Sequence, residues 1–60
     1  MTIDERLNTA ENNMIAGLNL YAEEELQDIL KDVVNGKETV TFEQNCRFLT
    51  LMYQVQDNLR

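Results

Sequence analysis

Four acidic side chains between residues 24 and 32 have the spacing that most suggests chemistry. Glu24, Asp28 and Asp32 follow one another at intervals of four residues, with Glu25 beside them. On a helix this spacing gathers the carboxylates into one ridge. Paired carboxylates can do acid–base work only with a raised pKa, and we expect this ridge to be too well solvated for that. The ridge is predicted to be an acidic surface that is either simply solvated or docks a basic partner.

Other catalytic side chains are scarce. The chain contains no His and no Ser, and neither glycine belongs to a phosphate-binding loop. Cys46 is the only cysteine, which excludes an internal disulfide and a cluster of cysteine metal ligands. Because Cys46 occupies a helical position flanked by apolar residues, we expect a buried, inert thiol. The sequence therefore predicts no enzymatic activity, no catalytic residues and no cofactor.

One short stretch, Val40-Thr41-Phe42-Glu43, resembles the end of an EF-hand loop. The loop positions that would bind calcium then hold Val33, Asn35, Lys37 and Gln44. Calcium needs mostly carboxylates there, and three of these four side chains cannot serve. No metal site is expected.

Length and charge narrow the remaining possibilities. Sixty residues make one small domain, residues 1–60, with a formal net charge of −6 and 43% hydrophobic residues. Such a chain is too apolar for a disordered tail and too acidic for direct binding to nucleic acid. Its first residues include Asp4, Glu5 and Arg6 and no long apolar run, so no signal peptide and no membrane span are expected. With its single cysteine, the protein is expected to be cytoplasmic.

Two capping boxes predict where helices begin. Thr2 is followed three residues later by Glu5, and Thr41 by Gln44. Helices are therefore predicted near residues 3–16 and 42–58. The apolar stripe of the first helix consists of Ile3, Leu7, Ala10, Met14 and Leu18.

A second helix is predicted near residues 20–34, because its apolar stripe points in another direction from the first. This stripe consists of Ala22, Leu26, Ile29, Leu30 and Val33. Gly17 can end the first helix and Asn19 can cap the second, although one helix kinked there is an alternative. Asn35-Gly36 is predicted to end the second helix, with a β-hairpin at this point as the second-ranked interpretation. The fold class is thus all-α, a small three-helix domain or a kinked helical hairpin.

The third predicted helix has more apolar surface than one neighbour can cover, since its apolar residues span roughly 220° of its circumference. We expect two copies of the chain to complete the core by forming a homodimer or higher oligomer. The predicted interface consists of Phe48, Leu51, Met52 and Val55. Residues 39–60 carry no net charge, whereas residues 1–38 carry a net charge of −6.

These observations favour a small non-enzymatic module that binds another protein, or an accessory or regulatory protein of that kind, through the apolar third helix. The alternative is an acidic inhibitor that mimics nucleic acid, of the kind phages use against host enzymes that bind DNA or RNA. Its acidic surface would be Glu24, Glu25, Asp28 and Asp32. A structural subunit of a larger assembly is a further alternative.

Overall fold

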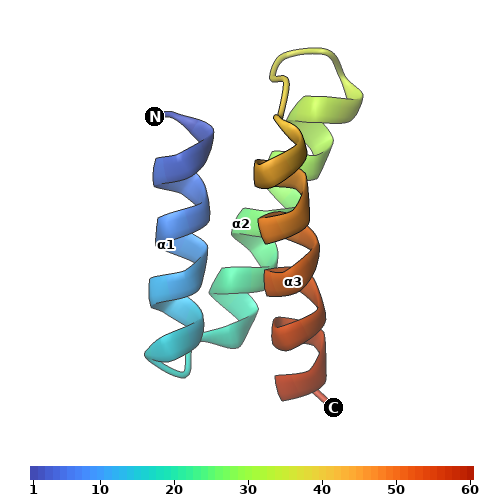
Figure 1. Cartoon of the computed structure of the whole chain (residues 1–60). Helices are drawn as coiled ribbons and strands as arrows, with labels where there is room; N and C mark the ends of the chain where they lie inside the picture. Colours follow the sequence, from blue (N-terminus) through green and yellow to red (C-terminus); the bar gives the residue numbers. More distant parts are fainter.

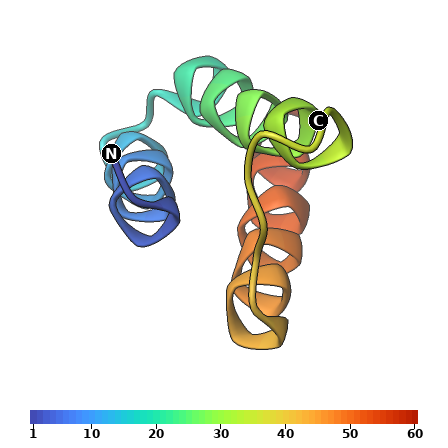
Figure 2. The same cartoon turned by 90° about the horizontal axis from the view of Figure 1, so that it is seen from above.

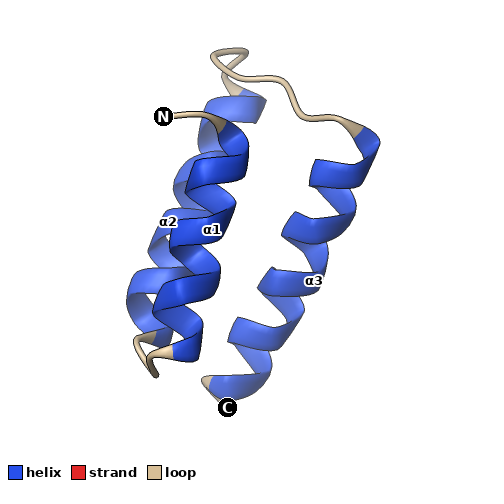
Figure 3. Ribbon diagram, turned by 60° about the vertical axis from the view of Figure 1, so that its left-hand side comes forward, coloured by secondary structure: helices blue, strands red, loops and turns tan.

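The chain forms three helices and no strand in a computed structural model that describes residues 1–60 (Figures 1 and 3). They are α1 (Ile3–Ile15), α2 (Asn19–Val34) and α3 (Phe42–Asn58). These bounds agree with the predicted spans to within one residue at each end. The all-α class and the three-helix arrangement are confirmed, and the alternative hairpin at Asn35-Gly36 does not form.

Both predicted capping boxes are present. The backbone N–H of Thr2 donates to Glu5 Oε1 at 3.0 Å, and the backbone N–H of Glu5 donates to Thr2 Oγ1 at 3.1 Å. The same pair of bonds joins Thr41 and Gln44, at 2.9 and 3.1 Å. Each box satisfies two backbone donors that a helix N-terminus otherwise leaves unpaired. Local sequence therefore determines where α1 and α3 begin.

Glycines follow the ends of α1 and α2, as predicted. Gly17 has a φ of 81° and Gly36 a φ of 76°, values that other residues adopt only with strain. The first helix ends at Ile15 and a second begins at Asn19, so the kinked-helix alternative is wrong. Asn19 does not cap α2, which corrects that prediction. The Leu18 carbonyl already accepts the backbone N–H of Ala22 at 3.0 Å, so Leu18 occupies the capping position and Asn19 lies inside the helix.

The three helices alternate in direction, so α1 and α3 run parallel and α2 runs antiparallel to both (Figure 1). Seen from above, α2 spans the distance between α1 and α3 (Figure 2). The α1–α2 pair, joined by a short turn, packs more extensively than either helix packs against α3. One hydrophobic core lies among them, and it consists of Ile3, Leu7, Ala10, Ala22, Leu26, Ile29, Phe48, Leu51 and Val55.

Polar contacts fix α1 against both neighbours. Arg6 on α1 reaches α2, where its Nε lies 3.1 Å from Glu25 Oε1 and its Nη1 lies 2.9 Å from Asp32 Oδ2. On the other side, Arg47 of α3 donates to Asn8 Oδ1 of α1 at 2.7 Å. These bonds lie at the edges of the apolar core and set the register of the helices.

Candidate interaction surface

The predicted interface residues lie mostly inside the protein. Phe48, Leu51 and Val55 are only 8%, 2% and 0% exposed, and Met52 is half-buried against the core. The expectation that a single chain leaves these side chains uncovered is therefore wrong. The reason is the orientation of α3, which turns this side of the helix toward α1 and α2. A charge at Leu51 would disrupt the fold itself, so such a variant cannot test self-association.

The uncovered apolar side of α3 is its outer side. Phe42 is 83% exposed, Leu49 46% and Tyr53 73%, and Cys46 between them is also exposed. Their successive spacings of four, three and four residues are those of a coiled-coil seam. The prediction of a buried Cys46 is wrong, because position 46 lies on the side of α3 opposite to the core. The excess of apolar surface on α3 was correctly inferred, but its location was not.

Neighbouring side chains of α2 extend this surface. Leu30 is 47% exposed and Val34 75% exposed. A shallow groove runs between α2 and α3. Its apolar lining is Leu30, Val34, Leu49 and Met52 with Phe48 beneath, and its polar lining is Gln27, Asp28, Lys31 and Gln56. We define the α2–α3 apolar face as Leu30, Val34, Phe42, Leu49, Met52 and Tyr53. It combines a groove between two helices with a ridge along α3.

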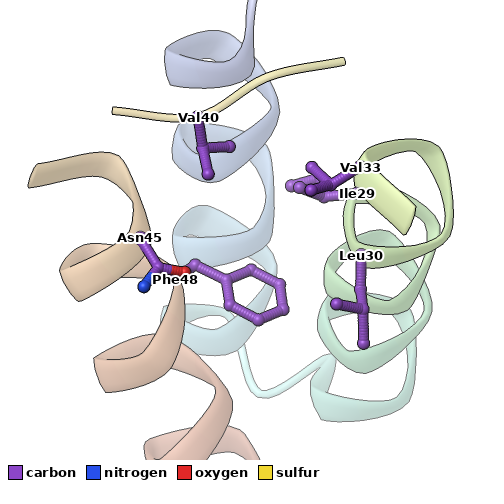
Figure 4. A pocket seen from close by; sticks show the side chains of 6 residues that line it. All are labelled: Ile29, Leu30, Val33, Val40, Asn45 and Phe48. Carbon is purple, nitrogen blue, oxygen red and sulfur yellow. The ribbon is translucent and has the colours of Figure 1, made fainter. Parts of the chain in front are cut away.

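A small cavity lies beside this groove, under the linker that joins α2 to α3 (Figure 4). Its volume is about 40 Å³, and the ring of Phe48 points into the space between α2 and α3. The cavity is lined by Ile29, Leu30, Val33, Val40, Asn45 and Phe48. Pockets for small molecules usually measure roughly 300–1,000 Å³. The cavity is a packing defect rather than a ligand site, so the open surface is the stronger candidate for recognition.

The four residues of the predicted acidic surface form two pairs, one bound to Arg6 and one exposed to solvent. Glu25 and Asp32 bind Arg6, whose side chain is only 14% exposed. Burial lowers the pKa of Arg6, but its hydrogen bonds to Asp32 and Glu25 outweigh that effect and raise the pKa. Glu24 and Asp28 remain exposed without such partners. Arg6 therefore reduces the repulsion among these carboxylates, and the sequence did not predict this pairing. Only two of the four predicted acidic residues remain free on the surface.

A second exposed apolar cluster surrounds the turn between α1 and α2. Ile15 is 75% exposed, Leu20 69% and Tyr21 65%, and they lie beside Gly17 at the opposite end of the bundle from the N-terminus. A shallow pocket at this turn is lined by residues 17–21 and by Leu59, which follows α3. No residue of α3 itself lines this pocket. The cluster provides a useful comparison surface for experiments on the α2–α3 apolar face.

No protein-family model, curated protein or solved structure matches this chain. None of the three helices has both the length and the apolar character needed to cross a membrane.

Proposed function

We propose that this chain is a non-enzymatic protein-interaction module and that the α2–α3 apolar face is its binding surface. The observation that carries the proposal is the exposure of Phe42 and Tyr53, at 83% and 73%, in one seam with Leu49. Single exposed apolar residues are ordinary on protein surfaces, but contiguous apolar patches of several hundred Å² usually mark interaction sites. Burying one such aromatic side chain contributes about 1.5–3 kcal/mol. The seam therefore supplies a substantial part of the affinity for a partner.

The competing proposal, a mimic of nucleic acid acting through acidic side chains, has less support. A mimic needs spaced carboxylates that are free to meet a positively charged cleft. Here Glu25 and Asp32 already hold Arg6 in a partly buried contact within the chain. Using them elsewhere would leave Arg6 without its partners, at a cost of about 2–3 kcal/mol. Glu24 and Asp28 are the only members of the predicted acidic surface left for that role.

A capture experiment tests the proposed function. The tagged chain is expressed in its native cells together with an untagged copy, and recovered proteins are quantified by mass spectrometry. Leu49→Asp should reduce recovery of the principal partner at least about tenfold, because it places a charge in the apolar face. Leu20→Asp is the matched control, since Leu20 is also exposed but lies in the cluster at the α1–α2 turn. It should leave recovery unchanged.

The same experiment separates the two proposals. Binding through the apolar face should vary little when the salt concentration rises, whereas binding through carboxylates should weaken steeply. The variant Glu24→Gln, which leaves the groove lining unchanged, should therefore bind as the wild type does. If that variant loses the partner while Leu49→Asp keeps it, the interaction module is the wrong interpretation and the acidic mimic replaces it.

A further inference from the structure

The α2–α3 apolar face contains two complementary shapes side by side. The ridge along α3 carries Phe42, Leu49 and Tyr53, and the adjacent groove is lined by Leu30, Val34 and Met52. Leu49 belongs to both, because it lines the groove and also lies in the ridge. An interface with two-fold symmetry uses the same surface on both copies and must therefore be complementary to itself. A neighbouring ridge and groove of similar chemistry meet that requirement.

The area of this face is a large part of what a standard dimer interface buries. A standard interface buries about 800 Å² on each partner, and homodimer interfaces are about 65% apolar. Phe42 and Tyr53 offer roughly 300 Å² between them, given their exposures of 83% and 73% and the usual size of aromatic side chains. Leu30, Val34 and Leu49 are each 46–75% exposed and add roughly 100–200 Å², so polar residues around the face would complete the contact.

The charge distribution points to the same arrangement. Each copy carries a net charge of −6, so two copies repel unless their acidic sides stay apart. The six residues of the α2–α3 apolar face include no acidic or basic side chain, and residues 39–60 carry no net charge. Glu24 is not among the residues that line the groove, whereas Asp28 and Lys31, which carry opposite charges, both line it. Contact through the α2–α3 apolar face therefore brings together surfaces whose groove residues carry no net charge, because Asp28 and Lys31 cancel.

We infer that the partner at the α2–α3 apolar face is a second copy of this chain, related by a two-fold axis that passes near Leu49. This inference depends on the proposed function and names its partner. The α3 helices run antiparallel, and each ridge lies in the groove between α2 and α3 of the other copy. The four helices α2, α3 and their symmetry mates then enclose one shared apolar layer.

Sedimentation equilibrium of the purified chain tests the inference, at concentrations from about 10 µM to about 1 mM, a range that covers weak and moderate dimers. The wild type should sediment as a dimer, and Leu49→Asp should raise Kd at least about 30-fold, as expected for the centre of an interface. Leu20→Asp should dimerise like the wild type. The thermal midpoint of the wild type should rise with protein concentration, and that of Leu49→Asp should not. Circular dichroism checks that Leu49→Asp keeps its helices, which its 46% exposure permits.

Disulfide trapping tests the position of the axis. In a Cys46→Ser background, Leu49→Cys should form a disulfide-linked dimer under mild oxidation, because residues on the axis bring their Cα atoms within about 7 Å. Thr50→Cys is the control, since Thr50 is also exposed but points about 100° away around α3. Equal trapping at both positions would contradict the proposed axis, and a dimer that survives Leu49→Asp would contradict the proposed face.

These experiments distinguish a failure of the self-association inference from a failure of the proposed function. A wild type that remains monomeric at about 1 mM overturns self-association. If Leu49→Asp nonetheless abolishes capture of a different protein from cells, the face is a binding surface for that protein and the proposed function stands. If neither self-association nor capture depends on Leu49, both the inference and the proposed function are wrong.

Discussion

Arg6 connects α1 to α2 through two carboxylates, and removing its charge should destabilise the fold more than any other loss of an arginine. Its side chain is 14% exposed, and those of Glu25 and Asp32 are 27% and 30% exposed. Breaking a fully buried ion pair costs about 3–5 kcal/mol, because the remaining charge is left without a partner. Here both carboxylates regain water when Arg6 is removed. We therefore expect Arg6→Gln to lower the free energy of unfolding by about 2–3 kcal/mol.

The other two arginines provide graded controls. Arg47 is 34% exposed and lies 3.5 Å from Glu11 Oε1, and Arg60 is 82% exposed and lies 3.8 Å from Asp57 Oδ1. Exposed ion pairs contribute about 0–1 kcal/mol. Arg47→Gln should cost about 1 kcal/mol, since it also loses the hydrogen bond to Asn8, and Arg60→Gln should have no measurable effect.

Urea and thermal unfolding, followed by circular dichroism at low protein concentration, measure these differences. In a domain of this size 1 kcal/mol corresponds to about 4–8 °C in Tm, so Arg6→Gln should lower Tm by roughly 10–20 °C. Double-mutant cycles with Glu25→Gln and Asp32→Asn should each give a coupling energy of about 0.5–3 kcal/mol. The reasoning is refuted if Arg6→Gln costs no more than Arg60→Gln, or if neither cycle shows coupling.

Three further predictions concern local features of the fold. The capping bond from the backbone N–H of Thr2, with a smaller effect of the Thr2 side chain, lowers the pKa of the Glu5 carboxylate. The wild type should therefore be more stable than Glu5→Gln near neutral pH, and this difference should shrink below about pH 5. Urea titrations at neutral and acid pH check this, and a constant difference would contradict it. Gly17→Ala and Gly36→Ala should each cost about 1–2 kcal/mol in urea unfolding through backbone strain alone, since no atom outside the immediate chain lies within 4 Å of the added Cβ. Val40→Ile should raise the free energy of unfolding by up to about 0.8 kcal/mol by filling the cavity under the linker, and an unchanged value in urea unfolding would contradict this.

Features that depend on a few neighbouring residues were predictable from the sequence. The starts of α1 and α3 follow from Thr and Glu or Gln spaced three apart, whose bonds need no tertiary contact. The ends of α1 and α2 follow from Gly17 and Gly36, because only glycine adopts a positive φ without strain. The start of α2 lacks such a signal, because its N-cap residue is Leu18, whose side chain makes no capping hydrogen bond.

The position of the surface could not be predicted in the same way. A helical wheel shows that α3 is apolar over a wide arc, but it does not show which part of the arc meets α1 and α2. The part of the arc that faces the core depends on the packing angles of all three helices. In this fold Leu51 and Val55 are buried, whereas Phe42 and Tyr53 are exposed. The heptad-like spacing from Phe42 to Tyr53 was the available signal.

The pairing of Arg6 was hidden for a different reason, because its partners lie 19 and 26 residues away. Glu25 and Asp32 are seven residues apart, two helical turns, and flank the apolar stripe of α2. A cation facing that flank from another helix could have been anticipated, but its identity depends on how α1 lies against α2.

The unequal packing of the three helices has a consequence for the order of folding. A short turn joins α1 to α2, and these helices make the most extensive contacts, whereas the bonds from α3 to α1 join residues 36–40 positions apart. Nearby contacts form before distant ones, because closing a longer loop costs more entropy. We expect an α1–α2 hairpin to form in the transition state and α3 to dock afterwards. Arg6→Gln should then slow folding, whereas Arg47→Gln should mainly accelerate unfolding.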